Sequence, residues 1–159
     1  MSIFNDFSGN YLQMKKNTII FFTALSIVFL DQLTKFLIKT KFQLNESLPI
    51  IKNILHFTYV TNTGSAFGLF KGFDLFFIIF SFTVIAAILY FMKNIKQNEK
   101  LMQVSFGLLL GGTIGNLADR ILFGHVIDFI DFRIWPVFNI ADSAITVSIV
   151  LLVILLWKK

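Results

Sequence analysis

Two aspartates, Asp128 and Asp142, are the side chains of this sequence best suited to acid–base chemistry. Each lies where an apolar stretch meets a polar one, and Arg133 is the only Lys or Arg between them. Two carboxylates that share a partly dry site cannot both ionise, so one keeps its proton. The ionised member can then take a proton from an attacking water, while the protonated member hydrogen-bonds a peptide carbonyl and helps the amine leave. A structural alternative stays open, in which each Asp caps a helix or pairs with Arg133 or Arg120.

Two further polar clusters have helical spacing. Asp31 and Lys35 are four residues apart, so they share a helix face and can form an ion pair that anchors the end of that helix. Asn116, Asp119 and Arg120 also share one face. We expect Asp119 to hold Arg120 in place, while Asn116 and Arg120 point hydrogen-bond donors inward.

Asp131 and a group of glycines have plainer interpretations. Asp131 lies two residues before Arg133, so an ion pair at the surface is expected rather than catalysis. Small residues in a helix let another helix approach closely, and this second helix can belong to the chain or to a substrate. The glycines of this stripe are Gly111, Gly112 and Gly115.

Other chemistries lack the residues that they need. The sequence has no Cys, and its only histidines are His56 and His125, which excludes the usual His and Cys metal sites. Neither His stands in a pattern with Ser and a carboxylate that would indicate a nucleophilic triad. No Lys follows the glycine cluster as in a phosphate-binding loop. We therefore expect neither a metal nor a cofactor.

The composition indicates an integral membrane protein. Of the 159 residues, 56% are hydrophobic and 14% are charged, and the mean hydropathy is +0.77. A water-soluble domain of this size would have to expose many Phe, Ile and Leu side chains. Four stretches are long enough to cross a bilayer, at about 18–38, 73–92, 101–122 and 138–157. We expect a single domain, a mainly α four-helix transmembrane bundle with both termini on the same side.

The lysines predict the orientation, because Lys and Arg are retained in short cytoplasmic loops. Seven lysines flank the spans on the side of the termini: Lys15, Lys16, Lys93, Lys96, Lys100, Lys158 and Lys159. This side is predicted to be cytoplasmic, and the net charge of +5 is then a topology signal with little left for nucleic acid. The apolar run after Lys16 resembles a signal peptide, but it continues into Asp31 and Lys35, which favours a retained span.

The polar segment 39–72 is too long for a plain connection and is expected to form a small structured piece. Leu55 to Val60 is rich in aromatic and β-branched residues and is followed by Asn62-Thr63-Gly64, a strand-then-turn pattern. A second strand or a re-entrant edge is predicted near Val126 to Phe132. By this topology all polar clusters lie at the membrane face opposite the cytoplasm.

Taken together, the clusters resemble the motifs of the lipoprotein signal peptidase family, also called signal peptidase II, in order and over nearly the whole chain. The motifs are Asp31 to Lys35; Asn62, Gly64 and Ala66; Gly111, Gly112, Gly115, Asn116, Asp119 and Arg120; Val126 to Asp128; and Phe138 to Ser143.

The resemblance implies an intramembrane aspartic endopeptidase without metal or cofactor, with Asp128 and Asp142 as the catalytic dyad. It assigns Asn62, Gly64, Asn116, Arg120 and Asn139 to holding the substrate and the dyad, and Asp31, Lys35 and Asp119 to structural support. The substrate would be a prolipoprotein, cut just before a Cys that already carries diacylglyceryl. Globomycin, a cyclic peptide, would inhibit. The implied location is the bacterial cytoplasmic (inner) membrane, in contact with membrane lipid, as a monomer. The resemblance also implies that segment 39–72 forms a small β-rich extracytoplasmic platform beside the site.

Two rival functions use the same residues differently. A small transporter or channel subunit could relay protons or bind cations with its carboxylates. It gives no reason for polar clusters that converge on one face instead of spanning the membrane. A membrane assembly factor would use them only structurally.

Overall fold

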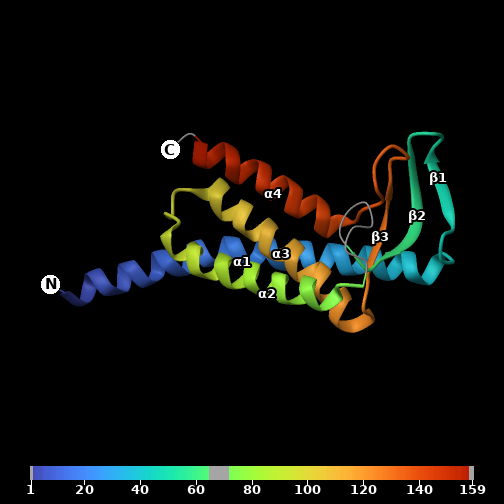
Figure 1. Ribbon diagram of the computed structural model, residues 1–159. Helices are drawn as coiled ribbons and strands as arrows, with labels where there is room; N and C mark the ends of the chain where they lie inside the picture. Colours follow the sequence, from blue (N-terminus) through green and yellow to red (C-terminus); the bar gives the residue numbers. More distant parts are fainter. Residues whose placement is uncertain (1, 65–71, 158–159) are drawn as a thin grey trace.

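Four long helices form a bundle in the computed structural model, which describes residues 2–64 and 72–157, the side chains of residues 2–16 excepted (Figure 1). They are α1 (Ser2–Lys41), α2 (Asp74–Phe91), α3 (Lys100–Phe123) and α4 (Ile140–Trp157), and a short 3-10 turn, Met92–Asn94, follows α2. Each helix contains a stretch long and apolar enough to cross a membrane. The predicted four-helix membrane fold is therefore confirmed.

Helix α3 is the centre of the bundle and packs against the other three helices. Its glycines make this possible: a Cβ on Gly111 would lie 2.6 Å from the Ala24 oxygen of α1, and one on Gly112 would lie 2.5 Å from the Ala141 oxygen of α4. Only hydrogen fits at such distances. The chain's own helices thus occupy the glycine stripe.

A three-stranded antiparallel sheet lies at one end of the bundle, with its strands crosswise to the helices (Figure 1). The order is β1 (Ser47–Ile51), β2 (Leu55–Asn62) and β3 (Val126–Asp131). We call this sheet the platform. Strands β2 and β3 confirm the two strand predictions, whereas β1 was not expected. A bridge between Ile130 and Phe138 brings the chain back towards the bundle before α4 begins.

A small apolar cluster fastens the platform to the helices. Ile38 near the end of α1 packs with Tyr59 of β2 and with Ile127 and Phe129 of β3, and all four are buried. A second cluster, which includes Ile20, fills the part of the bundle farther from the sheet. The position of β3 relative to α1 is therefore set by packing.

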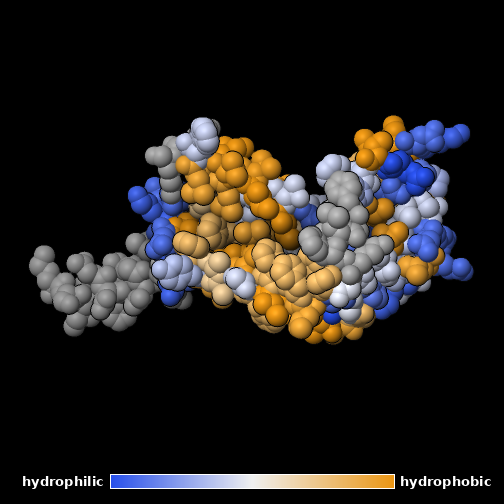
Figure 2. Space-filling model, in the orientation of Figure 1, coloured by the Kyte–Doolittle hydropathy of each residue, from blue (hydrophilic) through white to orange (hydrophobic). Residues whose placement is uncertain are grey.

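The outer surface of the helices is apolar and lies between two polar ends (Figure 2). Large side chains such as Phe22, Phe80 and Ile154 are about half exposed or more, as lipid-facing residues would be. Both termini lie at the end of the bundle opposite the platform (Figure 1). The chain therefore crosses the bundle an even number of times, as the four spans require.

Candidate active site

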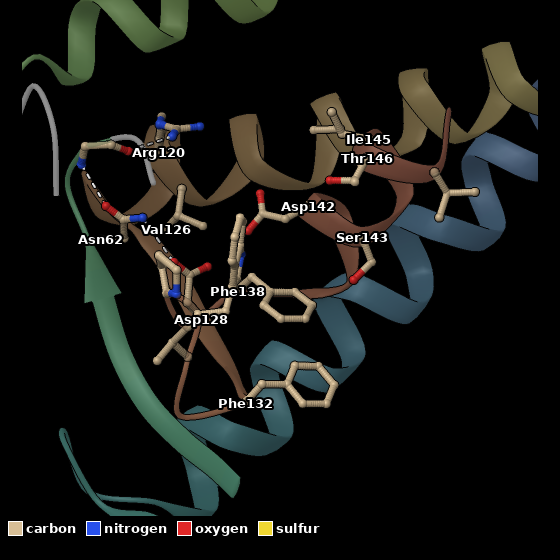
Figure 3. Close-up of a pocket in the computed structure, with 15 residues that line it drawn as sticks. Asn62, Arg120, Val126, Asp128, Phe132, Phe138, Asp142, Ser143, Ile145 and Thr146 are labelled. Atoms are coloured by element: carbon tan, nitrogen blue, oxygen red, sulfur yellow. Dashed lines mark hydrogen bonds between the residues drawn. The ribbon is translucent and has the colours of Figure 1, made fainter. Parts of the chain in front are cut away.

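A cavity of about 590 Å³ opens where the platform meets the ends of α3 and α4. Asp128 reaches it from β3 and Asp142 from the first turn of α4, and Figure 3 shows both carboxylates facing this space. The lining residues are Asn62, Gly64, Arg120, Val126, Asp128, Phe132, Trp135, Pro136, Val137, Phe138, Asp142, Ser143, Ile145, Thr146 and Val147. The fold thus brings together the two aspartates singled out from the sequence.

Asp128 is almost wholly buried, with 1% of its surface exposed. Its Oδ1 accepts a hydrogen bond of 2.6 Å from Asn139 Nδ2, and its Oδ2 accepts one of 3.1 Å from Asn62 Nδ2. Burial, together with the negative charge of Asp142, raises the pKa of Asp128 from 3.8 to about 7. A carboxyl group with such a pKa can hold a proton at neutral pH.

Asp142 is held by donors from two directions. Asn116 Nδ2 of α3 donates to its Oδ1 at 2.7 Å, and the Asn139 backbone N–H donates to its Oδ2 at 3.3 Å. In return, the Asp142 N–H donates to Asn139 Oδ1 at 2.8 Å. This reciprocal pair is a capping box at the start of α4. Asp142 therefore does cap a helix, as the structural alternative expected, and it also faces the cavity.

Asn139 links the two carboxylates. Besides Asp128, its buried Nδ2 lies 3.1 Å from Asn116 Oδ1 and 3.2 Å from the Ile127 oxygen. Since Asn116 donates to Asp142, one chain of hydrogen bonds runs from Asp128 through Asn139 and Asn116 to Asp142. Such a chain fixes the relative positions of the two aspartates.

A buried ion cluster contacts this chain of hydrogen bonds at Asn116. Lys35 Nζ lies 2.8 Å from Asp31 Oδ2, 2.9 Å from Asp119 Oδ2 and 3.0 Å from Asn116 Oδ1. The expected Asp31–Lys35 pair thus forms, with Asp119 as an additional partner. Asp119 contacts Lys35, and within the described part of the chain no salt bridge joins it to Arg120. This differs from the expectation that Asp119 holds Arg120.

The same cluster fastens α4 and β3. Asp31 Oδ1 accepts the backbone N–H of Ala141, the residue before Asp142, at 2.9 Å. Asp119 Oδ2 accepts the backbone N–H of Ile127, the residue before Asp128, at 3.0 Å. The two carboxylates of the ion cluster therefore each hold the backbone next to one cavity aspartate.

Gln32, which lies within the motif Asp31 to Lys35 but was given no role from the sequence, is a further member of this cluster. Its Nε2 lies 2.9 Å from Asp119 Oδ1, 3.1 Å from the Gly115 oxygen and 3.2 Å from Asp31 Oδ2. An amide inside a membrane-spanning stretch, directly after Asp31, was the available signal.

Arg120 lies on the cavity wall, away from the ion cluster. Its Nη2 is 3.4 Å from the Gly64 oxygen, and its guanidinium lies over the Phe77 ring at 4.9 Å. The buried Nε has no hydrogen-bond partner among the described residues. Arg120 therefore offers a donor beside the cavity.

The turn after β2 completes the polar side of the site. Gly64 N–H donates to Asn62 Oδ1 at 2.9 Å, so the Asn62 amide orients its Nδ2 towards Asp128 (Figure 3). Ala66, the third residue of this motif, and its neighbours Ser65 and Phe67 lie outside the described residues. Asn62 thus links the turn to Asp128.

Asp131 lies outside this arrangement. It is buried and accepts hydrogen bonds from Thr58 Oγ1 at 2.8 Å and from Arg133 N and Nη1 at 2.8 and 3.0 Å. Burial alone would raise its pKa, but these hydrogen bonds and the Arg133 charge hold the pKa below its usual value. The expected ion pair with Arg133 forms, but Asp131 is buried instead of lying at the surface. No group of three metal-ligating side chains occurs in residues 17–64 and 72–157.

Comparisons with known proteins agree on one family. A family model described as "Signal peptidase (SPase) II" matches residues 23–158. A protein of Halothermothrix orenii named lipoprotein signal peptidase is 43% identical over 141 residues, 88% of this chain and 96% of its own length. The protein of that name from Moorella thermoacetica is 46% identical over 129 residues, 81% of this chain and 86% of its own.

Solved structures give the same result for the fold. A bacterial membrane enzyme determined by the in meso method at 2.3 Å resolution aligns with a TM-score of 0.83 and 38% identity over 87% of both chains. A second, at 1.9 Å, aligns with a TM-score of 0.81 and 37% identity over 88% of this chain and 93% of its own.

Proposed function

Since the chain belongs to the signal peptidase II family, a family of proteases, we propose that it removes signal peptides from prolipoproteins by aspartic catalysis inside the membrane. The cut would fall just before a Cys that carries diacylglyceryl. The observation that carries the proposal is the arrangement of Asp128 and Asp142, which line one cavity and are joined through Asn139 and Asn116.

The proposed reaction uses one proton shared by the two aspartates. Asp128, with a pKa raised to about 7 by burial, holds this proton. Ionised Asp142 takes a proton from water, and the water oxygen attacks the carbonyl carbon of the scissile peptide. Protonated Asp128 hydrogen-bonds the carbonyl oxygen and passes its proton to that oxygen as the tetrahedral intermediate forms. The amine then leaves with a proton from Asp142, while one hydroxyl of the intermediate returns its proton to Asp128 and the carboxyl product forms.

Several polar groups would hold the two aspartates or the substrate backbone during this reaction. Asn116 and Asn139 keep the aspartates in place, and Asn62 does the same for Asp128. Arg120, with its Nε free of hydrogen bonds in the described structure, is best placed to donate to a substrate carbonyl. Asp31, Lys35 and Asp119 would act only through the backbone and side chains that they support.

The residues that line the cavity suit a signal peptide held at a membrane surface. Its polar end carries the aspartates, while Phe132, Trp135, Phe138 and Val147 supply aromatic and aliphatic walls. Val147 belongs to a membrane-spanning stretch of α4. An apolar helix could therefore stay in the bilayer while its end unwinds beside Asp142.

The location proposed is the bacterial inner membrane, with both termini cytoplasmic. The seven lysines at the end of the termini support this orientation. The platform and the cavity then lie near the extracytoplasmic face, where signal peptides end.

A reconstitution assay tests the function. The full chain, purified in lipid, is incubated with a diacylglyceryl-modified prolipoprotein, and release of the signal peptide is followed. We expect Asp128→Asn and Asp142→Asn each to lower the rate at least about 100-fold, because acid–base catalysis contributes about 10²–10⁴. Asp131→Asn is the matched control and should keep its rate, since Asp131 does not line the cavity and the asparagine Oδ1 can still accept the Arg133 N–H.

The outcomes separate this function from its rivals. If either dyad variant released signal peptide as fast as the unmodified chain, the catalytic role of that aspartate would be contradicted. Inhibition of this release by globomycin is expected. A chain that releases no signal peptide and does not bind globomycin would favour a transporter.

A further inference from the structure

The loop between β3 and α4 makes a sharp turn that directs two large apolar side chains outward. Arg133 has φ of 67°, in the left-handed region that non-glycine residues rarely adopt. Asp131 stabilises this turn, because its Oδ1 accepts the Arg133 N–H and its Oδ2 accepts the guanidinium. The next two residues, Ile134 and Trp135, are 93% and 60% exposed.

A second loop adds to this apolar surface. Ile51 ends β1 and Ile54 lies in the turn between β1 and β2, and both are about half exposed. Together with Phe132, Ile134 and Trp135, Ile54 lines a hollow of about 410 Å³. Two loops some 80 residues apart in sequence thus form one apolar surface, which we call the platform tip. A cluster of this kind in contact with water indicates a binding surface.

The platform tip is continuous with the membrane-facing surface of the bundle. Phe132 and Trp135 line both the hollow and the large cavity, and the large cavity is also lined by Val147 of α4. Val147 and Val150 are half exposed within a membrane-spanning stretch. The strands run crosswise to the helices, so the sheet extends across the end of the bundle at which α4 begins (Figure 1). Figure 2 shows apolar surface at this end of the platform.

The composition of the platform tip fits the boundary between lipid tails and headgroups. Trp is enriched at that boundary, where its ring is partly wet. Lys52, beside Ile51, is exposed and can reach the phosphates of anionic lipids. Lipid is favoured over a protein partner because the platform tip continues, through Phe132 and Trp135, into the surface that includes Val147 of the α4 span.

We propose that the platform tip is an interfacial anchor that binds phospholipid of the outer leaflet beside α4. The anchor fixes the outer end of β3 at the membrane surface, three residues from Asp128. Asp142 is carried by α4, which is itself embedded. The depth of both aspartates is then set by the same bilayer.

Tryptophan fluorescence tests the anchor in the absence of substrate. The chain has two Trp residues, and Trp157→Phe leaves Trp135 as the only one. This variant is reconstituted into phosphatidylcholine–phosphatidylglycerol vesicles whose acyl chains carry bromine near the headgroup. We expect the bromolipid to quench Trp135 and aqueous iodide to quench it little. In the same background, Ile134→Asn should lose much of the bromolipid quenching, while Leu44→Asn, at an exposed apolar position outside the platform tip, should not.

Three results would overturn the proposal. The first is quenching of Trp135 by iodide and not by bromolipid. The second is bromolipid quenching that appears only after prolipoprotein is added, which would make the platform tip a substrate contact. The third is an emission change that depends on the protein-to-lipid ratio, which would indicate a second copy of the chain. None of these results bears on peptidase activity, so this test is independent of the proposed function.

Discussion

Asn139 and Asp142 hold one another at the start of α4 through two reciprocal hydrogen bonds, of 2.8 Å and 3.3 Å. The Asn139 side chain also donates to Asp128 at 2.6 Å. One asparagine therefore begins a transmembrane helix and sets the geometry between two carboxylates. Helix capping and the candidate chemistry depend on different atoms of Asn139, which makes the two roles separable.

Substitutions of Asn139 should separate capping from catalysis. Asn139→Ser keeps an oxygen that can cap α4, whereas Asn139→Ala removes it and should cost about 1 kcal/mol more in unfolding free energy. Both lose the donor to Asp128. We expect both to lower kcat at least about tenfold, since Asp128 loses a contact that fixes its position and a misplacement of about 1 Å can cost about 100-fold in rate. Thermal unfolding and peptide release, measured on the same samples, check this. A serine variant with unchanged kcat would contradict the role in catalysis.

The pH dependence of activity should report the proton shared by the aspartates. Burial and the charge of Asp142 raise the pKa of Asp128 to about 7. Below this pH the pair keeps its proton, and above it both carboxylates ionise and the acid is lost. We therefore expect kcat/KM to fall above about pH 7, by up to about tenfold per pH unit. A rate that stays level to about pH 9 would contradict this.

Removing Asn62 should move that alkaline limb. The hydrogen bond from Asn62 favours the ionised form of Asp128 and so lowers its pKa. Without the bond the pKa rises further, and Asn62→Ala should shift the limb to higher pH whatever happens to the maximal rate. The pH profile of kcat/KM for the variant and the unmodified chain gives the comparison, and a shift to lower pH would be the wrong sign.

The sequence predicts the membrane fold and the two aspartates because both depend on local signals. Hydropathy alone marks the spans, and Asn139 and Asp142 have the three-residue spacing of a capping box. Strand β1 was missed because Ser47–Ile51 contains Pro49 and has all five residues exposed, so no buried face leaves a pattern.

Tertiary partners could not be predicted in the same way. Asp119 and Arg120 are adjacent, and successive helix side chains point about 100° apart. Asp119 consequently faces Lys35 on α1, while Arg120 faces the cavity. The Lys35–Asp119 pair joins residues 84 positions apart, and only the packing of α1 on α3 brings them together.

Replacing Lys35 should destabilise the fold strongly. The Lys35 side chain is 2% exposed, and its Nζ is the cation between Asp31 and Asp119. In Lys35→Met two buried carboxylates lose their counter-ion, a change that costs about 3–5 kcal/mol. Lys39→Met, one turn further along α1, removes only an exposed cation over the Phe123 ring and should cost about 1 kcal/mol or less. Thermal unfolding in detergent compares the two variants, and equal midpoints would contradict a structural role for the ion cluster.

A methyl group on Gly112 should displace Asp142 without touching it. The added Cβ would lie 2.5 Å from the Ala141 oxygen and 2.8 Å from Ile145 Cγ1, so α4 must move away from α3. We expect Gly112→Ala to lower the unfolding free energy by about 1–3 kcal/mol. Its kcat should fall further than the loss of folded protein explains, because a shift of about 1 Å can cost about 100-fold in rate. Leu122→Ala, on a lipid-exposed position of α3, is the control and should retain its kcat. If folded Gly112→Ala turned over substrate like the control, the contact between α3 and α4 would not set the position of Asp142.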